Sequence, residues 1–215
     1  MPAAHRAFVP AAGSDWLLPF YDPFTRLLGT STALQRLVDQ ARLAAGQRVL
    51  DLGCGTGALS LIAKRTQPGI EIVGLDPDAK ALARARRKVE RSGLAVTLEQ
   101  GFGDSLPFAD ASFDRVLSSF MFHHLETAQK PAVLREVRRV LRPGGSLHLV
   151  DFGGAGHGLG AFLARLVHRE ESLHANTDDA LTALMRDAGF ADAGETEQRS
   201  SRVGGLIYYR ATNHA

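Results

Sequence analysis

One short segment limits the possible folds of this 215-residue chain more than any other. From Val49 to Leu61 the chain reads VLDLGCGTGALSL, an apolar run that passes through Gly53, Gly55 and Gly57 before apolar residues return at helical spacing. A buried strand, a glycine turn and a helix in this order are typical of parallel α/β sheets, where the turn lets a ligand approach the backbone because no Cβ intervenes. The segment therefore predicts a ligand site at the carboxyl end of a core strand.

Two ligand classes fit this glycine loop. Gly53 and Gly55 satisfy the dinucleotide fingerprint in its G-x-G-x-x-A form, and Asp51 followed by the glycines fits an adenosyl-sulfonium site equally well. Asp51 favours the second ligand, because a carboxylate there suits an ammonium group and repels a pyrophosphate. Asp76, at the end of the next strand, can accept hydrogen bonds from both ribose hydroxyls of either ligand. Because Asp76 precedes Pro77, a turn or helix-capping role is the alternative.

The order of apolar segments predicts the fold class. Strand-like and helix-like stretches alternate from residue 47 to about 150, which indicates a parallel sheet with helices on both faces. The expected strands cover 47–52, 70–75, 95–100, 113–119, 145–151, 190–198 and 203–211. The expected helices cover 57–66, 78–92, 127–141, 161–169 and 177–188. We therefore expect an α/β protein with a doubly wound, seven-stranded, Rossmann-like sheet whose last strand is antiparallel.

Composition excludes several classes of protein. Cys54 is the single cysteine, which rules out an internal disulfide and a cysteine-rich metal cluster and fits a reducing compartment. No stretch approaches the roughly 20 apolar residues of a transmembrane helix. The net charge of +2 does not itself indicate a nucleic-acid partner, although ARARRKVERSG at 83–93 gathers basic residues that could face phosphates or simply water. We expect a soluble, cytoplasmic protein without a metal, and scattered His157, His168 and His174 do not change that expectation.

Four segments together resemble one family. VLDLGCGTG, GLDPD, LPFADASFDRVLSS and LREVRRVLRPGGSLHLVD, in this order and spacing, are similar to the class I methyltransferases that use S-adenosylmethionine, in the branch of the ubiquinone and menaquinone C-methyltransferases. The resemblance covers about 47–152 and implies a seven-stranded methyltransferase core at 46–215. It also implies an N-terminal helical lid at 1–45 and an acceptor-specific cap at about 153–176.

The resemblance further implies which residues hold the cofactor. Asp51 would lie near the ammonium of the methionine moiety, and Asp76, followed by Pro77, would hold the ribose. A tyrosine of the lid, Tyr21, would lie near the sulfonium, and Ser119 would contribute from the fourth strand. Around the methionine moiety itself, the family places Gly53, Gly55, Thr56 and Gly57.

The sequence departs from the family pattern where the adenine is read. The family usually has Gly-Asp-Ala before Leu-Pro-Phe, with the acid binding the adenine amine, but this chain has Phe102 in the place of that acid. Either Asp104 reaches the adenine from a shifted register, or the backbone near Gly103 reads it while Phe102 packs on the ring. We favour the second arrangement, and a plain core position for Phe102 is the remaining interpretation.

The fourth strand should lead into the reaction zone. It runs SFDRVLSS into FMFHHL, at the carboxyl edge where open α/β sheets bind ligands. Methyl transfer is an in-line displacement that depends mainly on alignment, and a base is needed only if the acceptor is protonated. His123 and His124 follow the strand and are the candidate bases, with His124 preferred. A pair that caps the next helix or lines the cavity is the alternative.

Three functions are compatible with these observations. The first is methyl transfer from S-adenosylmethionine, giving S-adenosylhomocysteine, to a small apolar or ring-bearing acceptor, with no nucleic acid involved. The second is an NAD(P)-dependent oxidoreductase, which Asp51 and the lack of a Tyr-x-x-x-Lys pair disfavour. The third is a non-catalytic module that binds adenosylmethionine and docks RNA or protein.

Overall fold

The computed structural model describes residues 30–153, 178–201 and 204–214. The candidate lid residue Tyr21, the helix expected at 161–169 and nearly all of the expected cap at 153–176 lie outside these residues. They therefore remain sequence-based expectations.

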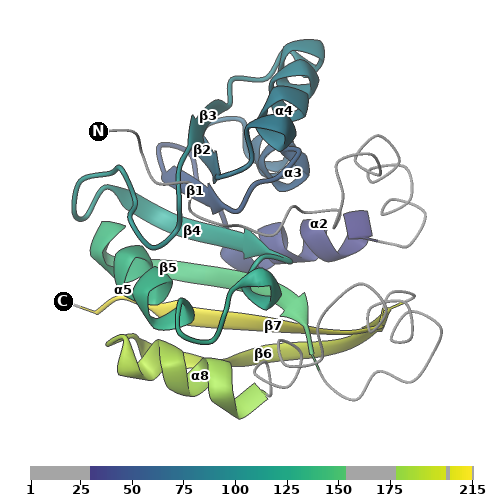
Figure 1. Cartoon of the computed structure of the whole chain (residues 1–215). Helices are drawn as coiled ribbons and strands as arrows, with labels where there is room; N and C mark the ends of the chain where they lie inside the picture. Colours follow the sequence, from purple (N-terminus) through teal and green to yellow (C-terminus); the bar gives the residue numbers. More distant parts are fainter. Residues whose placement is uncertain (1–29, 154–177, 202–203, 215) are drawn as a thin grey trace.

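The described chain forms one mixed sheet with helices on both faces (Figure 1). Its strands are β1 (Arg48–Leu52), β2 (Glu71–Asp76), β3 (Thr97–Gln100), β4 (Phe113–Ser119), β5 (Leu141–Phe152), β6 (Ala191–Ser201) and β7 (Gly204–Thr212). Its helices are α2 (Thr30–Ala41), α3 (Ala58–Thr66), α4 (Ala79–Ser92), the short 3-10 helix η1 (Phe122–His124), α5 (Lys130–Val140) and α8 (Asp178–Asp187). The strand order is β3-β2-β1-β4-β5-β7-β6, and β7 runs antiparallel to both of its neighbours. The expected doubly wound sheet with one antiparallel strand is confirmed.

The core has two layers because side chains of successive strand residues point to opposite faces of the sheet. In β1, Leu50 packs with α5 and α8 on one face, and Val49 packs with α2 and α3 on the other. Both side chains are fully buried. Near β2 and β3, α4 lies beside the glycine loop, since a Cβ on Gly57 would be 3.2 Å from the Cβ of Ala85.

Three element boundaries differ from the sequence-based expectation by three residues or more. The helix expected from residue 127 begins at Lys130, because Gln129 closes a turn first by accepting a hydrogen bond from the Glu126 N–H at 3.0 Å. β5 begins at Leu141 and not at residue 145, with an irregular register around the Pro-Gly-Gly segment. β6 continues to Ser201, through part of the segment where a turn was expected.

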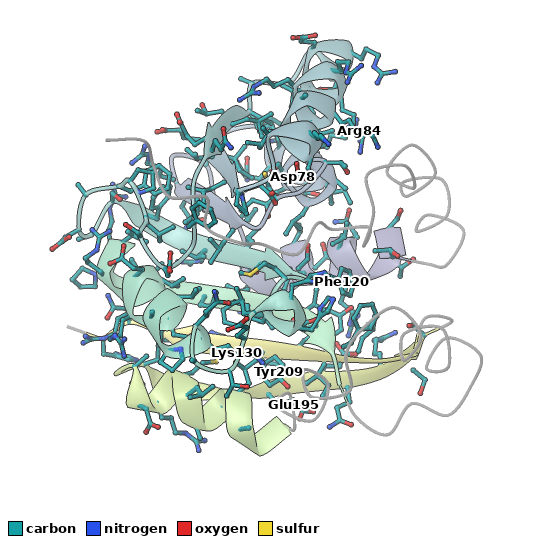
Figure 2. All side chains as sticks on the ribbon, viewed as in Figure 1. Asp78, Arg84, Phe120, Lys130, Glu195 and Tyr209 are labelled. Atoms are coloured by element: carbon teal, nitrogen blue, oxygen red, sulfur yellow. The ribbon has the colours of Figure 1, made fainter. Side chains whose placement is uncertain are left out.

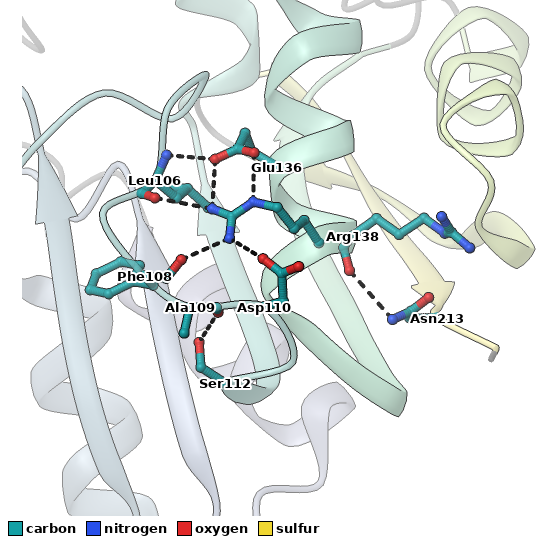
Figure 3. A network of polar contacts seen from close by, with 9 residues as sticks. Leu106, Phe108, Ala109, Asp110, Ser112, Glu136, Arg138 and Asn213 are labelled. Atoms are coloured by element: carbon teal, nitrogen blue, oxygen red, sulfur yellow. Dashed lines mark hydrogen bonds and ion pairs between the residues drawn. The ribbon is translucent and has the colours of Figure 1, made fainter.

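A charged network on α5 holds the loop between β3 and β4 in place (Figure 3). The Arg139 guanidinium donates to the carbonyl oxygens of Leu106 at 3.0 Å and Phe108 at 2.8 Å, and it also pairs with Glu136. Glu136 in turn accepts a hydrogen bond from the Leu106 N–H at 2.8 Å. These charge-assisted bonds raise the pKa of Arg139 and fix a loop that carries Phe102 to the carboxyl edge of the sheet.

Candidate active site

A cavity of about 690 Å³ lies at the carboxyl edge of β1, β2 and β4, where the sequence predicts the ligand site. Nine of the predicted site residues line it: Gly53, Gly55, Thr56, Asp76, Pro77, Phe102, Gly103, Ser119 and His124. Asp51, Gly57 and His123 are not among the described residues that line it. The fold therefore brings most of the predicted site together in one cavity, and three predicted members lie outside its lining.

The three glycines of the loop have different physical reasons to be glycine. All three adopt left-handed backbone conformations, with φ of +73° at Gly53, +51° at Gly55 and +78° at Gly57. A Cβ on Gly53 would come within 2.5 Å of the Met121 side chain, and one on Gly57 would press on Ala85. A Cβ on Gly55 would meet no atom within 4 Å, and Gly55 lines the cavity. Gly55 is thus the position where a side chain would enter ligand space.

Asp76 organises the loop as well as facing the cavity. One of its carboxylate oxygens accepts a hydrogen bond from the Gly55 N–H at 2.8 Å, and the other accepts one from the Asp78 N–H at 2.9 Å. Burial raises the pKa of Asp76, although these two backbone bonds oppose the rise. Each carboxylate oxygen has a second lone pair, so both can still accept from a ligand hydroxyl. The turn-forming and ligand-binding interpretations of Asp76 are compatible.

Asp78 is a cavity-lining carboxylate outside the predicted set of site residues. It caps α4 by accepting a hydrogen bond from the Lys80 N–H at 2.8 Å, and only 5% of the residue is exposed (Figure 2). Its second oxygen, Oδ2, is buried without a hydrogen-bond partner among the described residues. A buried carboxylate oxygen without a donor is costly, so a ligand donor at this end of the cavity would satisfy it. The helix-start pattern Asp-Pro-Asp predicts the cap, but nothing in the sequence indicates the unpartnered oxygen.

Asp51 lies behind the loop and does not line the cavity. It is fully buried, and its Oδ2 accepts a hydrogen bond from the Ser60 hydroxyl of α3 at 2.5 Å. Burial raises the pKa of Asp51 from 3.8 to about 7, against the opposing effect of the Ser60 bond. Its other oxygen, Oδ1, is buried without a hydrogen-bond partner among the described residues, so a position of Asp51 near the ligand ammonium stays a prediction.

The raised pKa of Asp51 predicts a pH-dependent stability. A carboxyl with a higher pKa in the folded chain binds an extra proton on folding, so its contribution is fully present below pH 3.8 and is lost as the pH rises through about 7. We expect Asp51→Asn to gain stability relative to the wild type as the pH rises from about 5 to about 8. Urea unfolding of the ligand-free proteins measures this difference. An equal difference at both pH values would contradict the assignment.

The region expected to read the adenine presents both candidate groups to the cavity. Phe102, Gly103 and Asp104 all line it. Phe102 forms an isolated antiparallel bridge with Ser105, and its residue is only partly buried. The interpretation of Phe102 as a plain core residue is therefore disfavoured, whereas packing by Phe102 and hydrogen bonding by Asp104 both stay open.

The two adjacent histidines have different environments. His123 is 5% exposed, and its Nδ1 lies 2.6 Å from Oδ1 of Asp151 at the end of β5. The His123 backbone N–H also donates to the other Asp151 oxygen at 2.9 Å. Burial raises the pKa of Asp151, but the contacts with His123 outweigh this effect and hold it below its usual value. His124 lines the cavity, and its ring packs 4.0 Å from that of His123, centroid to centroid.

Two unusual residues flank the histidine pair along the chain, Phe120 before it and Lys130 after it. Phe120, at the tip of β4 (Figure 2), has φ +53°, a conformation that costs a bulky residue about 1–3 kcal/mol. Its ring packs 5.0 Å from that of Phe152 at the end of β5. Lys130 is fully buried at the start of α5, and its pKa is lowered by burial against the attraction of Asp151. Sequence patterns do not predict a left-handed phenylalanine or a buried lysine.

Two negative findings apply to the described residues. They contain no group of three or more histidine, cysteine, aspartate or glutamate side chains that could hold a metal ion. None of the helices in the described ranges is long and apolar enough to cross a membrane.

The chain is similar to known methyltransferases. Residues 49–145 match the family model described as a methyltransferase domain. The chain is 42% identical over 139 residues to the demethylmenaquinone methyltransferase of Thermus thermophilus. This match covers 63% of this chain and 62% of that protein. It is 36% identical over 142 residues to the ubiquinone/menaquinone biosynthesis C-methyltransferase of Geobacter sulfurreducens, covering 63% of this chain and 55% of that protein. The chain therefore matches less than two thirds of the length of these relatives.

Among solved structures, phosphoethanolamine N-methyltransferase 2 of Haemonchus contortus in complex with S-adenosylmethionine matches with a TM-score of 0.72. The match covers 86% of this chain and 53% of that chain at 18% identity, so it shows the fold alone. Residues 49–145, with the glycine loop, are thus similar to a methyltransferase domain. The named relatives place this similarity in the branch of the ubiquinone and menaquinone C-methyltransferases.

Proposed function

We propose that this protein transfers a methyl group from S-adenosylmethionine to a ring carbon of a small, quinol-like acceptor. The observation that carries the proposal is a single cavity in which the glycine loop, Asp76 and His124 face the same space. The names of the relatives support the acceptor class, since they act in menaquinone and ubiquinone biosynthesis by C-methylation or on demethylmenaquinone.

The loop side of the cavity fits the cofactor. Open space beside Gly55 admits the amino-acid end, and Asp76 can accept from the ribose hydroxyls. The unpartnered Oδ2 of Asp78 offers a further acceptor for a nucleoside donor group. When bound, S-adenosylmethionine supplies a methyl group that is already activated by the positive sulfur, so the protein needs mainly to align it and exclude water.

The cavity lining also includes apolar side chains that fit a ring, namely Leu34, Phe120, Met121, Leu125 and Val133. His124 lines the same cavity. In the proposed reaction, His124 accepts the proton of an acceptor hydroxyl, the electron pair of the resulting anion makes the ring carbon nucleophilic, and that carbon bonds to the methyl group. With the methyl donor bound, the positive sulfur would take up the electron pair of the broken carbon–sulfur bond, and the ring proton would pass to water, which restores the aromatic ring.

Calorimetry separates this proposal from the oxidoreductase alternative. S-adenosylhomocysteine should bind the wild-type protein with a micromolar dissociation constant, and NADH should not bind. Binding of NADH alone would overturn the proposal. Binding of S-adenosylhomocysteine without turnover on any quinol would favour a non-catalytic binding module.

Asp76→Ala should weaken binding of S-adenosylhomocysteine by about tenfold to a hundredfold, because the ribose hydroxyls lose a charged acceptor worth about 1.5–3 kcal/mol. The substitution also removes the hydrogen bonds that Asp76 accepts from Gly55 and Asp78. Asp76→Asn, which keeps one acceptor oxygen, should lose less affinity. Calorimetry measures both variants, and unchanged affinity in Asp76→Ala would remove Asp76 from the site.

A further inference from the structure

One face of α4 is a continuous stripe of cations. At 100° per residue, its members fall within about 100° of one another around the helix axis. The stripe consists of Lys80, Arg84, Arg87, Lys88 and Arg91. The buried residues Ala81, Leu82 and Ala85 form a separate face that packs toward the sheet. Arg86 points about 150° away from the centre of the stripe.

The arginines of this stripe are not neutralised by acids in the part of the chain that the structure describes. Arg87 donates to the Ala83 carbonyl at 3.2 Å and Arg91 to the Arg87 carbonyl at 3.1 Å, which are backbone contacts and not ion pairs. The Nη1 of Arg84 is buried without a hydrogen-bond partner there, whereas Arg87 and Arg91 are exposed. Arg87 and Arg91 therefore keep their positive charge available to an external anion.

The stripe reaches the mouth of the cavity. Lys88 and Arg91 line the cavity together with Arg65 from the last turn of α3. Lys88 also donates a hydrogen bond to the hydroxyl of Thr56, in the glycine loop, at 2.8 Å. In Figure 1, α4 stands at the end of the molecule opposite α8, so it can meet a surface without involving the α8 side of the molecule.

We propose that the stripe on α4 docks the protein on anionic lipid headgroups, so that a lipid-soluble acceptor enters the cavity from the membrane surface. The choice of lipid over another polyanion rests on the proposed function, because a quinol acceptor dissolves in the bilayer and the cationic stripe adjoins the cavity that would receive it. Each basic residue near an anionic surface strengthens binding by about fivefold, so the exposed Arg87 and Arg91 together strengthen it by about twenty-five-fold.

Sedimentation with lipid vesicles tests the proposal on the full chain without cofactor. The protein should sediment with vesicles containing phosphatidylglycerol, remain in solution with phosphatidylcholine alone, and be released at about 1 M salt, where the Debye length is about 3 Å. Arg87→Glu should weaken vesicle binding at least tenfold. Arg86→Glu has the same charge change one residue away but lies off the stripe, and it should weaken binding less than threefold. Thermal unfolding verifies that both variants fold.

Several results would overturn the proposal. Equal weakening in the two variants would mean that only net charge matters, and equal binding to both kinds of vesicle would remove the electrostatic mechanism. Tighter binding to single-stranded RNA than to phosphatidylglycerol vesicles would assign the stripe to nucleic acid. If the protein binds vesicles but transfers no methyl group, the proposed function is wrong and the docking surface is not. If the protein methylates a detergent-dispersed acceptor but does not bind vesicles, the docking surface is wrong and the proposed function is not.

Discussion

Replacing Gly55 with valine should abolish binding of S-adenosylhomocysteine while leaving the protein folded. Gly55 lines the cavity with φ +51°, and no protein atom lies within 4 Å of its missing Cβ. A branched side chain would therefore occupy ligand space without displacing protein atoms. The strain of a left-handed valine costs about 1–2 kcal/mol, which a cooperative fold of this size tolerates. Calorimetry measures the binding and urea unfolding measures the stability.

Gly46→Val is the matched control for backbone strain. Gly46 also has a left-handed conformation, at φ +82°, and also has no atom within 4 Å of its missing Cβ, but it is not among the cavity residues. It should lose a similar amount of stability and keep full affinity. Normal binding by Gly55→Val would show that the loop is not the cofactor site.

Replacing His124 with alanine should lower kcat by about 10²- to 10⁴-fold if His124 accepts the acceptor proton. Affinity for S-adenosylhomocysteine should change little. The fall in activity at acidic pH that protonation of a histidine causes should disappear from the pH profile. If the loss appears mainly in KM and the acidic fall persists, His124 only shapes the cavity, and alignment with exclusion of water accounts for the rate.

His123→Ala provides the comparison, because the neighbouring side chain has a different environment. His123 is buried against Asp151, so its removal leaves a buried carboxylate without its partner. We expect this variant to lose about 3 kcal/mol of stability in urea unfolding, whereas His124→Ala should lose much less. Equal, small effects on stability and rate at both positions would contradict the assignment of separate roles.

The sequence predicts the frame of this protein well, because its signals are local. Short apolar strands bounded by Gly, Pro or Asp gave the sheet, and the turn at Gly93, with φ +67°, ends α4 where expected. The glycine loop and Asp76 reach one cavity because parallel strands have their carboxyl ends at the same edge.

The parts that the sequence does not predict depend on contacts between distant segments. Ser60 on α3 meets Asp51 only after the helix packs on the sheet, and this contact gives Asp51 a buried protein partner. The separation of His123 from His124 depends on Asp151, which lies 28 residues further along the chain. The left-handed conformation of Phe120 is also not predicted, since no pattern of residue types indicates it. His123 and His124, which the sequence marks as candidate bases in the same way, therefore have unequal access to the cavity.

Transfer of a labelled methyl group tests the central claim most directly. The full chain is incubated with S-adenosylmethionine carrying a labelled methyl group and with a demethylated menaquinol dispersed in detergent, and His124→Ala serves as the matched variant. The account predicts label in the lipid extract, one S-adenosylhomocysteine formed for each methyl transferred, and a rate that falls steeply in the variant. Binding of S-adenosylhomocysteine with no label in any quinol extract, at any pH where the protein is folded, would contradict it.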